Sequence, residues 1–180
     1  MSEWQTGQRL QQVVDELGAM TAQIDGTQLN ALADILHQAP AVFFSGQGRS
    51  GLMVKALAIR LMHIGLKVYV AGESSTPAIA AGEWLVAVSS SAKTPATLSH
   101  IAAARKAGAS IALISAAEAP TIQADLTLVL PARSQVPTSQ HAGSLFEQSL
   151  LLAGDAMAWR VQHLRGQADA QLDRRHANLQ

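Results

Sequence analysis

Five short apolar segments, with helical patterns between several of them, limit the folds open to this chain. Each segment is a nearly continuous apolar run, which is typical of a strand buried on both faces of a parallel sheet. Such strands alternating with helices predict an α/β fold, with a five-stranded parallel sheet flanked by helices in a flavodoxin-like three-layer sandwich. The predicted strands span residues 42–44, 68–70, 85–88, 111–114 and 126–130. Ligands of such sheets bind beyond the carboxyl ends of the strands, so the segments that follow the strands are where a site is expected.

The length of 180 residues predicts one domain with a sizeable core. We expect a single domain over residues 1–180, with its core at about 30–165. Apolar residues recur at helical spacing before the first strand, which predicts helices within 1–38. These helices and the charged tail, 166–180, are expected to pack on the core or on neighbouring subunits.

Charge is scarce in this chain. Charged residues make up 14% of it, against about 25% in typical soluble domains. A chain with so few charged residues is expected to bury part of its surface in the subunit interfaces of a homodimer or homotetramer. The formal net charge of zero argues against binding to nucleic acid or an acidic membrane. With no cysteine, no metal-ligand spacing among the histidines, and no signal peptide or spanning segment in the pattern, we expect a cytoplasmic protein without a bound metal.

The segment 89–94 (SSSAKT) follows the third predicted strand and precedes a helix predicted from 96 to 107. Thr94 stands at the expected N-cap and Pro95 at the first helical position, where a missing N–H costs nothing. Hydroxyls, free backbone N–H groups, a lysine and the positive end of a helix dipole therefore meet at one place. This combination favours a phosphate or another small anion. The alternative is a serine-rich turn that only caps the helix.

The segment 46–51 (GQGRSG) follows the first strand and opens a helix predicted over 52–63. Its glycines match the dinucleotide-binding fingerprint, and Glu73 stands about 20 residues on. Arg49 and Ser50 instead favour a loop that binds a polar ligand, and a plain strand-to-helix turn is the third interpretation. The hydroxyl-rich segment 74–77 follows the second strand. We expect these turns to be neighbours of the 89–94 loop.

A polar stretch, 131–143, is predicted to be a loop, and a helix follows it from about 144 to 162. This helix is apolar on all sides, which predicts burial in the core or between subunits. Glu147 shares its helical face with Leu151, Gly154 and Ala158. A carboxylate there needs either a partner, such as a structural arginine, or a catalytic role as a base.

Several of these segments together resemble the sugar isomerase (SIS) family, and within it the 6-phospho-3-hexuloisomerase group. The resemblance covers nearly the whole chain. The shared segments are 48–51 (GRSG), 60–65 (RLMHIG), 72–77 (GESSTP), 89–94 (SSSAKT), 143–148 (GSLFEQ) and 176–179 (HANL). The last two are the most specific to this group.

The resemblance implies an enzyme that interconverts D-arabino-hex-3-ulose 6-phosphate and fructose 6-phosphate through an enediol, in formaldehyde fixation by the ribulose monophosphate pathway, without a cofactor. It implies Glu147 as the base and His176, from a neighbouring subunit, as a second catalytic residue. The family loop reads S-x-S-G-x-T, so Ala92 replaces a glycine and predicts crowding against the phosphate or a different turn. The implied substrate-binding residues are Ser50, Ser89, Ser90, Ser91, Ala92, Lys93 and Thr94.

Two other functions fit the same pattern. One is a different sugar-phosphate isomerase of the same fold. The other is a non-catalytic protein that senses a sugar phosphate, as SIS modules do within transcription regulators. The chain offers no segment for a helix-turn-helix beside the sheet, and a sensor does not need a lone carboxylate on an apolar helix.

Overall fold

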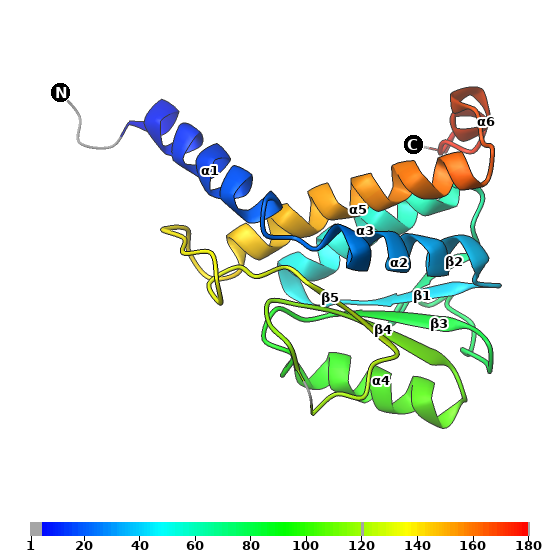
Figure 1. Ribbon diagram of the computed structural model, residues 1–180. Coiled ribbons are helices and arrows are strands. Elements are labelled where there is room, and N and C mark those ends of the chain that lie inside the picture. Colours follow the sequence, from blue (N-terminus) through cyan, green and yellow to red (C-terminus); the bar gives the residue numbers. More distant parts are fainter. Residues whose placement is uncertain (1–4, 120, 180) are drawn as a thin grey trace.

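The computed structural model describes residues 5–119 and 121–179, and it contains one parallel five-stranded sheet (Figure 1). The strands run in the order β2-β1-β3-β4-β5 across the sheet. Their bounds are β1 Val42–Ser45, β2 Val68–Val70, β3 Trp84–Val88, β4 Ser110–Ser115 and β5 Leu126–Val129. All four strand pairs are parallel, which confirms the predicted α/β sheet and its five strands.

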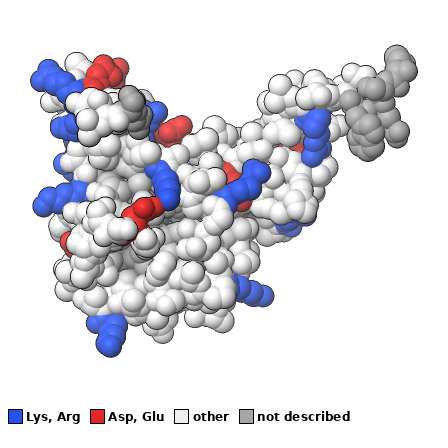
Figure 2. Space-filling view, turned by 180° about the vertical axis from the view of Figure 1, so that it is seen from behind, with Lys and Arg blue, Asp and Glu red and all other residues white. Residues whose placement is uncertain are grey.

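Helices cover both faces of the sheet. Their bounds are α1 Thr6–Thr21, α2 Gly26–Gln38, α3 Gly48–Ile64, α4 Pro95–Lys106, α5 Ser144–Leu164 and α6 Asp169–Arg174. Helices α2, α3 and α5 lie on one face and α4 on the other, while α1 extends beyond the body along the start of α5 (Figure 1). The predicted N-terminal helices are thereby confirmed for the described residues. Most of the surface seen from behind is uncharged (Figure 2).

The core consists of two apolar layers, one on each face of the sheet. Val86 and Val88 of β3 point toward α3 and α5, whereas Leu85 and Ala87 point toward α4. Because side chains alternate along a strand, a strand with apolar residues at every position must be covered on both sides. This is the physical reason that continuous apolar runs correctly predicted the central strands.

The glycine segment at the start of α3 differs from its prediction. The helix begins at Gly48, before the expected residue 52, so Arg49 and Ser50 belong to its first turn. A Cβ on Gly51 would lie 2.7 Å from the carbonyl oxygen of Gly46, so this close approach of helix and strand requires glycine. Glu73, the acidic residue at the fingerprint spacing, pairs with Lys55 at 2.5 Å. These contacts favour strand-to-helix packing as the role of the glycines.

The tail returns to the carboxyl end of α3. Arg175 Nη1 donates a hydrogen bond of 3.0 Å to the carbonyl oxygen of His63, the kind of contact that satisfies the last carbonyls of a helix. The His176 ring stacks on His63 with centroids 4.9 Å apart. His63 is buried, as expected for a packed core residue. Within the described residues, no helix is both long and apolar enough to cross a membrane.

Candidate active site

A pocket of about 370 Å³ opens at the carboxyl edge of the sheet, beyond β1 and β3. Ligand pockets usually hold about 300–1,000 Å³, so this one suits a small molecule. Three segments that are distant in the sequence form its walls: the start of α3, the loop after β3, and the loop that leads into α5. The lining residues are Gln47, Ser50, Val88, Ser89, Ser90, Ser91, Thr94, Arg133, Ala142, Gly143 and Glu147.

The loop after β3 presents its hydroxyls to this pocket. Thr94 is the N-cap residue of α4 and Pro95 the first helical residue, as predicted, but the Thr94 side chain does not cap the helix. Its Oγ1 instead lies 2.9 Å from Ser89 Oγ. Within the described residues, the backbone N–H groups of Ser90 and Ser91 have no acceptor. The loop therefore offers hydrogen-bond donors that its own fold does not use.

Ala92 holds this loop in an unusual backbone conformation. Its φ of 54° lies in the left-handed region, which glycine adopts freely and alanine rarely. The turn is closed by a 3.0 Å hydrogen bond from Ala92 N to the Ser89 carbonyl. Alanine thus adopts a glycine conformation at this position. Lys93 does not line the pocket, but borders a separate hollow of about 200 Å³ on the other side of the loop.

Two of the three hydroxyl-rich turns meet as expected. Ser50 of the first turn and the 89–94 loop face the same pocket, because β1 and β3 are neighbours in the sheet. The third turn, 74–77, does not line this pocket. It follows β2 at the edge of the sheet, and its Thr76 Oγ1 donates to the Val70 carbonyl at 2.5 Å. The pocket is therefore shared by the turns after β1 and β3, as expected, and the 74–77 turn follows the neighbouring strand outside it.

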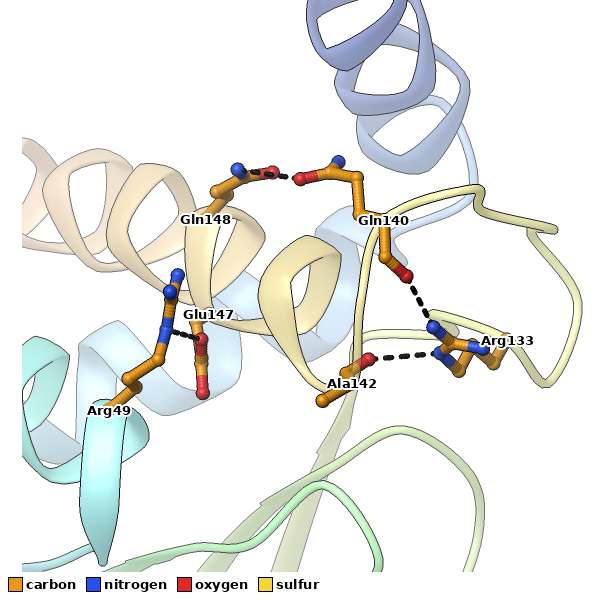
Figure 3. A network of polar contacts seen from close by, with 6 residues as sticks. All are labelled: Arg49, Arg133, Gln140, Ala142, Glu147 and Gln148. Carbon is orange, nitrogen blue, oxygen red and sulfur yellow. Dashed lines mark hydrogen bonds and ion pairs between the residues drawn. The ribbon is translucent and has the colours of Figure 1, made fainter.

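Glu147 lies at the pocket wall in the first turn of α5. Its residue surface is 8% exposed, which confirms the expected burial. Its Oε2 accepts a 2.5 Å hydrogen bond from Arg49 Nε, and the Arg49 side chain is 67% exposed (Figure 3). A buried carboxylate requires such a partner, and the helix N-terminus also favours its negative charge. Since the arginine stands at the solvent-exposed rim, the carboxylate faces a pocket and is not sealed inside the core.

The loop 131–143 is ordered by three sets of polar contacts. Arg133 donates to the carbonyl oxygens of Gln140 and Ala142, the second at 2.9 Å from Nε (Figure 3). Gln140 Oε1 accepts a 2.8 Å bond from Gln148 Nε2, next to Glu147 on α5. Glu16 of α1 accepts bonds from residues 138–140. These contacts hold the loop, which the sequence shows only to be polar, in position at the wall of the pocket.

Glu16 carries a perturbed pKa because of this loop. Burial raises the pKa of its carboxyl, but the hydrogen bonds from Thr138, Ser139 and Gln140 outweigh that effect and lower the pKa to about 2. Hydrogen bonds to the charged form favour ionisation. Glu16 is therefore a charged clamp that ties α1 to the pocket loop.

His176 lies outside the pocket of its own chain. It stacks on His63 at the carboxyl end of α3, while Ser50 stands at the amino end. The helix has 17 residues, and a rise of about 1.5 Å per residue places its ends about 25 Å apart. Burial, with repulsion from His176 and Arg60, lowers the pKa of His63. Hence His176 does not reach the pocket of its own chain.

Sequence reasoning did not identify every residue of the pocket. Gln47, Arg133, Ala142 and Gly143 were not among its site candidates, and Arg49 was noted only as a side chain suited to phosphate. For Arg49, the signal was its position in the glycine segment. Arg133 had no such signal, because a polar loop has no periodicity to place its side chains. Among the residues described, no group of three His, Asp or Glu side chains is arranged to hold a metal ion.

Comparison with known proteins finds curated relatives that cover nearly the whole chain. No family model matches the chain. A 3-hexulose-6-phosphate isomerase from Mycobacterium gastri is 39% identical, over 93% of this chain and 88% of its own. One from Bacillus subtilis is 32% identical, over 97% and 99%. The crystal structure of a hypothetical protein from Methanococcus jannaschii, inferred to be a 3-hexulose-6-phosphate isomerase, has 27% identity and a TM-score of 0.84, over 96% of this chain and 99% of that one.

Proposed function

We propose that this chain, which belongs to the family of 3-hexulose-6-phosphate isomerases, interconverts D-arabino-hex-3-ulose 6-phosphate and fructose 6-phosphate. The observation that carries the proposal is the buried carboxylate of Glu147 at the wall of a pocket rich in hydroxyls. An isomerase of this type needs a base beside the sugar carbons and a grip on the phosphate. The pocket combines both within about 370 Å³.

The 89–94 loop would bind the phosphate. The hydroxyls of Ser89, Ser91 and Thr94 and the N–H groups of Ser90 and Ser91 are suited to phosphate oxygens, at the amino end of α4. Ser50 would contribute from the opposite loop. Ala92 and Lys93 would contribute through the conformation of the turn and not through side-chain contacts with the phosphate, since both border the neighbouring hollow.

The reaction moves a carbonyl from C3 to C2. Glu147 would remove the proton from C2, while the electron pair of that C–H bond forms the C2–C3 double bond of an enediolate and the C3 carbonyl oxygen takes the negative charge. The O2 proton passes to O3, directly or through the base. The carboxylic acid then returns a proton to C3, and the C2 carbonyl forms. One base that serves both carbons is sufficient because C2 and C3 are adjacent.

Two further groups would support this step. The Arg49 guanidinium, paired with Glu147, stands where it orients the carboxylate and where its charge would stabilise the enediolate. His176 would polarise a substrate oxygen only from a neighbouring subunit, since it lies at the far end of α3 in its own chain.

Glu147→Gln tests the base. The amide keeps the size of the side chain but cannot accept the proton, so kcat should fall by about 10²–10⁴-fold. The variant should retain its fold by circular dichroism and its affinity for fructose 6-phosphate by calorimetry. Glu73→Gln, which removes another carboxylate from an ion pair, is the matched control and should keep normal turnover. Near-normal kcat in Glu147→Gln would refute the assignment.

A coupled assay tests the substrate and the pathway. Ribulose 5-phosphate, formaldehyde and a hexulose-phosphate synthase would be supplied, and fructose 6-phosphate followed with and without this protein. Formation of product that depends on both formaldehyde and the protein supports the proposed reaction in formaldehyde fixation. Absence of such product, with activity on another sugar phosphate, would favour a different isomerase of the same fold.

We also propose that the protein is a cytoplasmic homodimer or homotetramer. The outer surfaces of α3 and α5 lie side by side, joined by the Arg60–Asp155 pair at 3.8 Å. They expose large apolar side chains, with Leu52 59% exposed and Trp159 64% exposed in the single chain. Apolar surface of this kind favours contact with a partner. A monomer by light scattering at micromolar concentration would contradict this proposal.

A further inference from the structure

Arg133 is the one cationic side chain that lines the pocket, within the part of the chain that the structure describes. The sequence placed a lysine, Lys93, in the phosphate loop. That lysine borders the adjacent hollow, whereas Arg133 reaches the pocket from the loop between β5 and α5. A phosphate bound by the 89–94 loop would otherwise meet only hydroxyls, N–H groups and the helix dipole.

The guanidinium of Arg133 is held in place before any ligand binds. Its Nε donates to the Ala142 carbonyl at 2.9 Å and its Nη2 to the Gln140 carbonyl, while the described residues offer Nη1 no acceptor (Figure 3). Gln140 is itself fixed, because its side chain bonds to Glu16 and Gln148. An arginine fixed in this way loses little further freedom when it binds a ligand.

The backbone at this point is strained. Arg133 has a φ of 63°, and the other two described non-glycine residues with positive φ are Ala142, at 48°, and Ala92, at 54°. Arg133 and Ala142 line the pocket, and Ala92 lies in the loop that forms its opposite wall. An L-residue is strained in this conformation, and strain of this kind gathers at functional sites. The positions of these three residues indicate that the strained backbone serves to form the walls of the pocket.

We propose that Arg133 is a substrate-binding residue that contacts the phosphate of the sugar phosphate through Nη1. This inference rests on the proposed function, because it requires a phosphorylated ligand in the pocket. A guanidinium matches phosphate oxygens in geometry and keeps its charge at every working pH. The contact is made to a group that does not react, so it stabilises the bound substrate and the transition state equally and acts on KM.

The test compares Arg133→Gln with the wild type in KM, kcat and the dissociation constant for inorganic phosphate and for fructose 6-phosphate. We expect KM and both dissociation constants to rise about 10- to 100-fold, as for the loss of a hydrogen bond to a charged group, with kcat within a few-fold of wild type. Arg165→Gln is the matched control. Arg165 is also exposed and also donates to a backbone carbonyl, that of His37 at 3.3 Å, at the far end of α5.

Three outcomes would overturn the inference. If Arg133→Gln binds inorganic phosphate and fructose 6-phosphate as tightly as the wild type does, Arg133 does not contact the ligand. If kcat falls as far as KM rises, Arg133 acts by positioning the loop before Glu147 and not by holding phosphate. If wild type binds neither inorganic phosphate nor fructose 6-phosphate, the proposed function fails as well. Weaker binding at retained kcat supports the inference.

Discussion

Ala92→Gly should stabilise the protein, although replacement of alanine by glycine normally destabilises one. Ala92 has a φ of 54°, in the left-handed region. There an L-residue with a Cβ costs roughly 1–2 kcal/mol, which glycine avoids. Glycine also gains freedom in the unfolded chain, which offsets about 0.4–1 kcal/mol. The net gain is about 1 kcal/mol, or about 2–4 °C in Tm for a chain of this length.

Urea unfolding followed by circular dichroism would measure this change, with Ala22→Gly as the control. Ala22 is exposed and has a φ of −68°, so its replacement relieves no strain and should cost about 0.5–1 kcal/mol. The two variants should therefore differ by about 1.5–2 kcal/mol in the free energy of unfolding. Equal destabilisation of both variants would show that the turn at Ala92 stores no strain, and the reasoning would be refuted.

The remaining predictions concern the two side chains that hold the pocket in shape. The pKa of Glu16 in the folded protein, about 2, lies below its ordinary 4.5, so its contribution to stability is complete above pH 4.5 and is lost as pH falls toward 2. Glu16→Gln should remove this part of the pH dependence in urea titrations between pH 7 and pH 3, and an unchanged profile would contradict the clamp. Arg49→Gln should lower the free energy of unfolding by about 1–3 kcal/mol, because it leaves the buried carboxylate of Glu147 without its charged partner. It should also lower kcat about 100-fold in steady-state kinetics; a kcat equal to that of wild type would exclude Arg49 from the proposed step.

The sheet was predictable because its signal is local. Each predicted strand is a nearly continuous apolar run, so short windows of sequence suffice to find it. Residues 89–94 were located correctly at the end of β3, with Thr94 and Pro95 at the start of α4. The start of α3 was placed four residues too late, because the glycine segment was interpreted as a turn, whereas the helix already begins at Gly48 within it.

The site was predictable only in part. Glu147 was conspicuous because a carboxylate on an apolar helix is costly to bury, and the structure places it at the pocket wall. Its partner Arg49 is 98 residues away, and no local pattern joins the two. Lys93 shares a loop with the pocket serines but points to another hollow, since neighbouring residues of a turn face different directions.

The sequence by itself determined the fold class, the edge of the sheet where the pocket opens, and the carboxylate that stands there. These follow from hydrophobic periodicity and from the cost of burying charge, which are properties of short segments. Only the tertiary structure decided which arginine joins Glu147, which cation lines the pocket, and that His176 lies at the end of α3 that is far from the pocket of its own chain. Those facts depend on contacts between segments far apart in the chain, and such contacts arise from packing and not from local pattern.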